Sequence, residues 1–238
     1  SSAASDVYKR QNIYHEALER YSKKLDREST DWFSVTDAKR DELAMEAINE
    51  VIDEYAGFGI FDTAESQHSI SHMKAVFKQT VWALTTQIRR GSFVPERFEF
   101  SFYESLDMAN DVTVDIKGRV DRTDTYTDEG RLFVKVLDYK SGNTVFDLVK
   151  LYYGTQLQLA VYMDAVMEQK KEALKQVSVE PGGMLYYHID DPVIDLKDVT
   201  PGTELSEEEI NQMILKKLKP DGLINSCLLY TSDAADEL

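Results

Sequence analysis

The hydrophobic repeat of this chain changes period once, at Gly91, and that change limits the folds open to it. Before Gly91 apolar residues recur every three or four positions, which is the spacing of amphipathic helices. After Gly91 apolar and polar residues alternate, which is the spacing of half-buried strands. Helices followed by strands, then by a further helix and strand, predict an α/β fold: a mixed sheet flanked by helices, with a helical N-terminal part.

Three helices are expected before Gly91. Apolar spacing predicts the first over residues 13–25, and Thr36 is placed to cap a second that continues to Val51. The third is expected over about residues 66–90, with its apolar side chains on one face. A loop rich in glycine is expected over residues 57–63.

Strands dominate the second part of the chain. A turn at residues 127–130 is expected to join two of them as a hairpin, and a helix is expected over about residues 153–176. Ser206 followed by Glu209 is a capping-box pattern, which predicts a last helix to about Leu218. The expected strands, in chain order, are 93–104, 112–126, 131–140 and 182–190.

Composition excludes several classes of protein. No apolar run is long enough for a membrane span, so we expect a cytoplasmic protein without membrane contact. The single cysteine, Cys227, excludes an internal disulfide and a cysteine-based metal site within the chain. The net charge of -16 argues against a broadly basic nucleic-acid binder. It still allows a local basic groove or a site whose sign is changed by a divalent metal.

Both ends of the chain differ from their neighbours. Residues 1–11 and 227–238 lack clear periodicity, and we expect non-native tails there, resembling translated adapter sequence. Ordinary disordered termini are the alternative. Between them we expect one domain over residues 12–226, divided into a helical part (12–90) and a sheet core with closing helices (91–226).

The strand expected over residues 131–140 ends in Asp138-Tyr139-Lys140. Residues i and i+2 of a strand share a face, so Asp138 and Lys140 are expected to point together. Asp121 lies at a similar distance on the other side of the hairpin turn, so strand pairing could bring the two carboxylates together, given slack for a bulge. The alternative is a solvated strand end, with Asp121 in surface ion pairs with Arg119 and Arg122.

Two adjacent carboxylates raise one another's pKa, and a divalent cation between them removes that cost. Oxygen ligands of this kind suit Mg²⁺ or Mn²⁺. A lysine beside the metal, here Lys140, could hold the metal-bound water or stabilise charge on a phosphoryl group. The residues therefore point to a phosphodiester as substrate.

Four motifs in the expected order resemble the RecB-type PD-(D/E)XK nucleases. They are YHEALERY (residues 14–21), GRVDR (118–122), DYKSG (138–142) and YYGTQLQLAVY (152–162). The last of these, extended to residue 166, is most similar to the AddB (RexB-like) subunits of bacterial AddAB helicase–nucleases. The resemblance spans about residues 13–225 and implies a restriction-endonuclease-like core.

The resemblance also implies residue roles. Asp121 and Asp138 match the metal-binding carboxylates, which with Lys140 form the catalytic set; His15 and the Tyr139 carbonyl match further metal ligands. Taken alone, His15 would more often be a surface or core histidine of its helix. DNA-binding or supporting roles are implied for Gln158, Tyr162, Arg119 and Arg122.

By resemblance, the chain is expected to be a Mg²⁺- or Mn²⁺-dependent deoxyribonuclease (exonuclease) domain of a helicase–nuclease subunit. It would act on DNA in double-strand-break repair by recombination, together with an AddA-like partner. The family also carries an iron–sulfur cluster, for which this chain has no ligand cysteines, so activity of the isolated fragment stays open.

Two alternatives are a catalytically silent DNA-binding or scaffold module and a stand-alone CRISPR-associated exonuclease. The long helical stretch over residues 36–90 favours the repair subunit over the stand-alone enzyme. The sequence does not specify the polarity of cutting, the exo- or endonucleolytic preference, a recognition sequence, or the choice between one metal and two.

Overall fold

The computed structural model describes residues 2–57, 64–108, 112–140, 158–188, 206–217, 220–225 and 228 of the 238-residue chain. The chain divides into two compact units. The first contains the helices before Arg90 together with the last helix, and the second contains the sheet and one helix.

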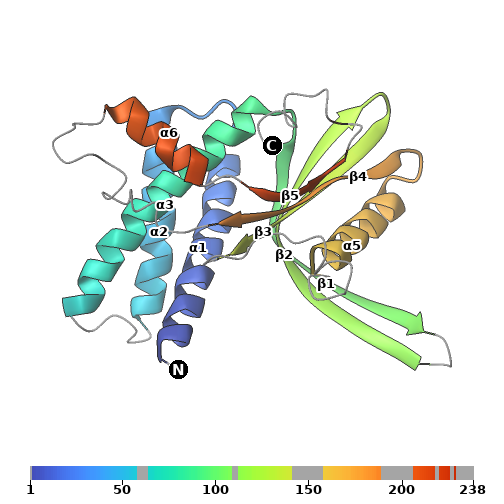
Figure 1. Ribbon diagram of the computed structural model, residues 1–238, viewed down its shortest axis with the longest axis horizontal. Coiled ribbons are helices and arrows are strands. Elements are labelled where there is room, and N and C mark those ends of the chain that lie inside the picture. Colours follow the sequence, from blue (N-terminus) through green and yellow to red (C-terminus); the bar gives the residue numbers. More distant parts are fainter. Residues whose placement is uncertain are drawn as a thin grey trace. The chain divides into compact units, whose positions relative to one another are not determined.

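The first unit begins with three helices, α1 (Ser2–Arg27), α2 (Asp37–Ala56) and α3 (Ala64–Arg90) (Figure 1). The prediction of three helices is confirmed, although α1 begins well before residue 13. Thr36 caps α2 as predicted, because its hydroxyl accepts a hydrogen bond from the Lys39 backbone N–H at 3.3 Å.

Helices α1 and α2 pack through a buried apolar seam bordered by ion pairs. Arg20 donates two hydrogen bonds to the Glu54 carboxylate, at 2.8 and 3.0 Å, and Lys24 reaches Glu50 at 2.6 Å. Exposed pairs of this kind contribute little stability, so the apolar side chains stabilise the pair of helices. The buried apolar residues of α1 are Ile13, Tyr14, Ala17, Leu18, Tyr21 and Leu25.

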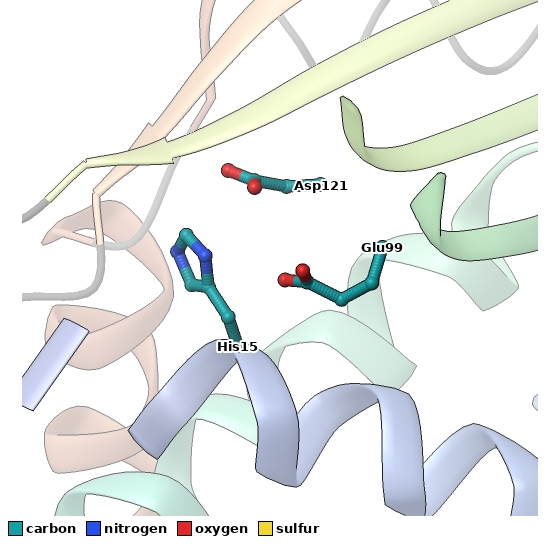
Figure 2. A group of neighbouring side chains, drawn as sticks. All are labelled: His15, Glu99 and Asp121. Carbon is teal, nitrogen blue, oxygen red and sulfur yellow. The ribbon is translucent and has the colours of Figure 1, made fainter. Parts of the chain in front are cut away.

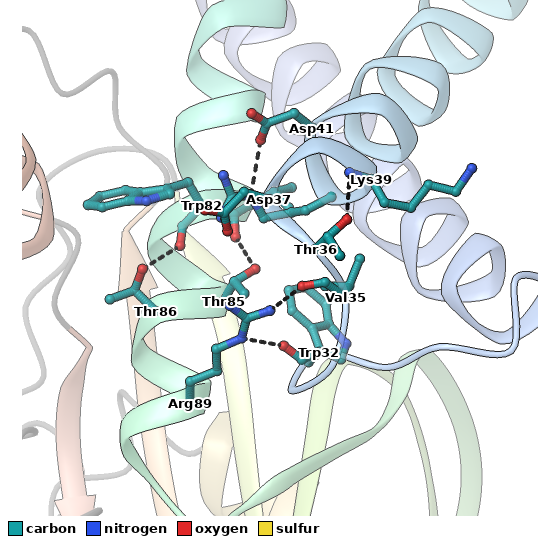
Figure 3. A network of polar contacts seen from close by, with 12 residues as sticks. Trp32, Val35, Thr36, Asp37, Lys39, Asp41, Trp82, Thr85, Thr86 and Arg89 are labelled. Atoms are coloured by element: carbon teal, nitrogen blue, oxygen red, sulfur yellow. Dashed lines mark hydrogen bonds and ion pairs between the residues drawn. The ribbon is translucent and has the colours of Figure 1, made fainter.

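The segment between α1 and α2 is fixed to the end of α3 by one arginine (Figure 3). Arg89 donates from Nε to the Trp32 carbonyl at 3.0 Å and from a terminal nitrogen to the Val35 carbonyl at 2.5 Å. One turn earlier, the hydroxyls of Thr85 and Thr86 donate to backbone carbonyls of their own helix. Arg89 therefore satisfies carbonyls that no helix or strand would otherwise pair.

Helix α6 (Glu207–Lys217) closes the first unit, near the predicted position. The Ser206 hydroxyl accepts from the Glu209 N–H at 3.2 Å, and the Glu209 carboxylate accepts from the Ser206 N–H at 2.8 Å. This reciprocal pair is the capping box that the sequence predicts.

The second unit is built on a five-stranded mixed sheet in the order β1-β2-β3-β4-β5. Strand β5 has no counterpart among the strands expected from the sequence, whereas the other four lie near their expected positions. The strands are β1 (Val94–Met108), β2 (Val112–Asp128), β3 (Arg131–Lys140), β4 (Ser178–His188) and β5 (Asp221–Ile224).

A tight turn joins β2 to β3. Glu129 and Gly130 both have positive φ, 47° and 78°, which is the backbone of a two-residue type I′ hairpin turn. The turn sets an antiparallel register that runs from the Asp128–Arg131 pair to the Arg122–Leu137 pair. Eight consecutive residues of β3 are buried, as expected for a central strand.

Helix α5 (Gln158–Ala173) packs on the sheet; residues 153–157 of the helix predicted there lie outside the described residues. Its Leu159, Tyr162, Met163 and Val166 form one apolar cluster with side chains of β2 and β3. A second cluster contains Phe93, Phe133 and Leu228.

None of the described helices carries a stretch both long enough and apolar enough to cross a bilayer.

Candidate active site

Asp121 reaches from β2 to the neighbouring strand. Its Oδ2 accepts a hydrogen bond from the backbone N–H of Tyr139 at 2.7 Å. The ladder between β2 and β3 ends at the Arg122–Leu137 pair, so Asp121 and Asp138 are the next residues on the two strands. Both aspartates are buried. The Asp121 carboxylate therefore lies at the peptide group that joins Asp138 to Tyr139.

A second acid, Glu99, lies beside Asp121 on β1. A carboxylate oxygen of Glu99 lies within 4.8 Å of one from Asp121, and Figure 2 shows both carboxylates extending to the same side. The Glu99 side chain is only 7% exposed, and one of its oxygens accepts from Arg119 Nε at 2.9 Å. Glu99 has a φ of 56°, a conformation that is uncommon for residues other than glycine and is often found at functional sites.

Sequence reasoning missed Glu99 because it assumed unbroken alternation along β1. Arg97 donates to Gln169 on α5, and its guanidinium lies 4.4 Å from the centre of the Phe100 ring. Residues 97 and 100 therefore share one side of the strand, which regular alternation forbids. The positive φ of Glu99 lies between them. The sequence carries no local pattern that would predict this reversal.

The other face of the hairpin holds a buried ion pair. Arg122 donates to both oxygens of Asp124, at 2.7 and 2.5 Å, and to the Tyr139 hydroxyl at 3.3 Å. Burial by itself lowers the pKa of the Arg122 guanidinium, but the charge of Asp124 and the Tyr139 contact outweigh burial and hold that pKa above its ordinary value. Burial raises the pKa of the Tyr139 phenol to about 12, against the opposing effect of Arg122.

The two arginines of the GRVDR motif therefore differ in environment. Arg122 is 4% exposed and its guanidinium is held inside the protein, a position that suits support of the site rather than contact with DNA. The Arg119 side chain is 49% exposed and bonds Glu99.

Gln158 and Tyr162 lie one turn apart on α5 and are hydrogen-bonded, with Gln158 Nε2 donating to the Tyr162 hydroxyl at 2.6 Å. The Tyr162 ring meets Phe102 edge to face at 5.6 Å. A Cβ at Gly118 would lie 2.7 Å from Phe102 and 2.8 Å from Tyr162. Glycine in the GRVDR motif thus allows α5 to approach β2.

Two further residues implied by the motifs have these positions. Lys140 is the last residue of β3, two positions after Asp138, and is half-buried. His15 is buried on α1, in the first unit, and Figure 2 draws it with the two acids of the second. The roles of both are part of the proposal below.

The fold, with acids from adjacent strands at a hairpin, defines a class of nuclease core, and comparison with known families agrees. A family model described as the PD-(D/E)XK nuclease superfamily matches residues 10–231. The chain belongs to the PD-(D/E)XK nuclease superfamily. The resemblance inferred from the four motifs is thereby confirmed.

The relatives found are named as B-type subunits of ATP-dependent helicase/deoxyribonucleases. The protein from Lachnoclostridium phytofermentans is 37% identical over 232 residues, covering 95% of this chain and 19% of the relative. That from Alkaliphilus metalliredigens is 35% identical over 222 residues, covering 89% and 18%. A Clostridium botulinum protein is 32% identical over 217 residues, covering 88% and 18%. The chain thus spans about a fifth of the length of these relatives.

Proposed function

We propose that this chain is a metal-dependent deoxyribonuclease domain that hydrolyses phosphodiester bonds. The observation that carries the proposal is the buried pair of carboxylates, Glu99 and Asp121, with Asp121 bonded to the Tyr139 N–H of the Asp138-Tyr139-Lys140 segment. Membership of a nuclease superfamily supports the same reaction class.

The residues present fit a divalent cation. Carboxylates grouped in the protein interior repel one another, and a bound cation removes that cost. Carboxylate and carbonyl oxygens are ligands that Mg²⁺ and Mn²⁺ prefer, and Mn²⁺ also accepts imidazole nitrogen. We assign Asp121, Asp138 and the Tyr139 carbonyl as ligands, with His15 from α1 as a further ligand and Glu99 as an additional acid.

Each residue then has a distinct task. When bound, the cation would neutralise phosphate charge and lower the pKa of a coordinated water. Lys140 would stabilise negative charge that develops on the phosphoryl oxygens. Asp121 would also fix the Tyr139 carbonyl through the adjacent N–H, because both belong to the same backbone segment. Gln158 and Tyr162 would support the site and the bound strand from α5.

The wider role is proposed from the relatives' names. We infer that the chain is the nuclease part of a helicase–nuclease subunit that works on DNA with an AddA-like partner, in the cytoplasm, during double-strand-break repair. An iron–sulfur cluster does not fit the chain by itself, because Cys227 is its only cysteine.

Hydrolysis of labelled single-stranded DNA in Mg²⁺ or Mn²⁺ tests the proposal. Asp138→Ala and Lys140→Ala are expected to reduce the rate by at least about 100-fold while leaving circular dichroism and thermal unfolding unchanged. Exposed residues on α5 supply matched controls, Asp164→Ala and Lys171→Ala, which should cut at the wild-type rate.

Metal binding separates catalysis from a scaffold role. Saturable Mn²⁺ binding that is lost in Asp121→Ala supports the nuclease. A wild-type chain that binds DNA, takes up no Mn²⁺ and releases no product would overturn it in favour of the scaffold.

A further inference from the structure

The paired strands β1 and β2 form a two-stranded ribbon with two unlike faces. Residues 112–121 of β2 pair with β1, and pairing with β3 begins at Arg122 (Figure 1). One face of this ribbon packs against α5 through Phe102 and Gly118. The other face, called here the outer face, carries the exposed side chains of Ser101, Tyr103, Ser105, Asp115, Lys117 and Arg119.

The outer face leads directly to the candidate active site. Its cross-strand pairs, counted away from Asp121, are Ser101–Arg119, then Tyr103–Lys117, then Ser105–Asp115. Arg119 also bonds Glu99 at 2.9 Å, which joins the first of these pairs to the acids. With about 3.4 Å per strand residue, the Tyr103–Lys117 pair lies about 14 Å from Asp121 along the ribbon.

Tyr103 is unusually exposed for a large ring, at 61%. Its orientation is nevertheless fixed from below. The Ser105 hydroxyl donates to Asp115 at 2.6 Å, and hydrogen bonds from Ser105 and then from the Tyr103 hydroxyl lower the pKa of Asp115. A ring held in place and open to solvent on a strand surface is the geometry on which a nucleic-acid base stacks.

We propose that the outer face holds a single strand of DNA and guides it to the acids, with a base stacked on Tyr103 and phosphates at Lys117 and Arg119. This inference rests on the proposed function and adds the path of the substrate strand. The chemistry of the face favours nucleic acid over a protein partner. Two cations and two hydroxyls surround a single aromatic ring, whereas protein interfaces have an apolar centre of several side chains.

Binding of a labelled oligothymidylate to the whole chain tests the stacking step. It is measured in Ca²⁺, under conditions where electrophoresis detects no product. Tyr103→Ala is expected to weaken binding by about 5- to 150-fold, and Tyr103→Trp to retain it. The new tryptophan should be quenched by the oligonucleotide after the wild-type signal of Trp32 and Trp82 is subtracted. Phe33→Ala, at another exposed ring (39%), is the matched control and should bind normally.

The salt dependence of binding tests the phosphate step. Each phosphate contact to a single strand contributes about -0.7 to the slope of log K against log salt concentration. Lys117→Gln is therefore expected to reduce the slope by about 0.7 in magnitude. Lys171→Gln, an exposed lysine on α5, should leave the slope unchanged.

The outcomes separate this inference from the proposed function. If all variants bind as the wild type does while DNA is still cut in Mn²⁺, the DNA path is overturned and hydrolysis stands. If binding depends on Tyr103 and Lys117 but the wild type cuts nothing, hydrolysis is overturned and the path is supported. A wild type that fails to bind the oligonucleotide overturns the path.

Discussion

Asp121 Oδ2 accepts the backbone hydrogen bond of Tyr139 at 2.7 Å, so one carboxylate both lines the candidate site and replaces a ladder acceptor for the next strand. A buried N–H without an acceptor is costly, so the contact ties strand geometry to the position of the acid. Substitutions at this position can therefore separate the two roles.

Asp121→Asn and Asp121→Ala should differ in stability but not in metal binding. An asparagine oxygen can still accept from Tyr139 N–H, whereas alanine leaves the N–H unsatisfied at a cost of about 1–3 kcal/mol. Both variants lose a charged ligand, so both should bind Mn²⁺ at least about 10-fold more weakly. Urea unfolding and Mn²⁺ titration measure the two effects, and equal stability of the two variants would contradict the backbone role.

Arg122→Met should destabilise the fold strongly, because it leaves the Asp124 carboxylate buried without its cation. We expect a loss of about 3–5 kcal/mol in the free energy of unfolding. Arg119→Met, at an exposed ion pair in the same motif, should cost about 1 kcal/mol or less. Chemical denaturation compares them, and similar losses for both would show that burial does not distinguish the two arginines.

Gly118→Ala should destabilise the packing of α5 on β2. The new methyl group would approach Phe102 and Tyr162 at less than 3 Å, and overpacking of this kind costs about 1–3 kcal/mol. Phe102→Leu should partly restore the stability of the variant. Gly130→Ala tests the other requirement for glycine, since its Cβ would meet nothing within 4 Å but its φ is 78°; Phe102→Leu should not rescue it.

Asp31 should make a pH-dependent contribution to stability. Hydrogen bonds from the Ser34 hydroxyl and N–H, then from the Phe33 N–H, hold the pKa of its carboxyl below the ordinary value. A lowered pKa in the folded state stabilises the fold above the unfolded-state pKa, and this is lost as pH falls through the folded-state value. Asp31→Ala should therefore be less stable than wild type at pH 7, and the difference should shrink in acid. A difference independent of pH would contradict this.

Features set by neighbouring residues were predictable from sequence. The Thr36 cap, the Ser206–Glu209 capping box and the hairpin turn each depend on a few adjacent side chains, and each is confirmed. The bounds of β3 were predicted for the same reason, because a turn fixes its start and a charged pair its end.

Features set by contacts between distant segments were not. Glu99 departs from alternation through its own backbone conformation, and Arg122 is charged yet buried because Asp124 and Tyr139 pair with it. Strand β5 has only four residues, two of them Asp221 and Gly222, which carry little preference for a strand. Its pairing with β4 decides its conformation.

The two-residue turn at Glu129 and Gly130 also bears on how the chain folds. The Asp121–Tyr139 contact joins residues only 18 apart, and the intervening hairpin can zip from its turn. Little loop-closure entropy is lost at each step, so this contact has a low contact order. We expect it to form early in folding, which makes the aspartate's placement the part of the candidate site least dependent on distant segments of the chain.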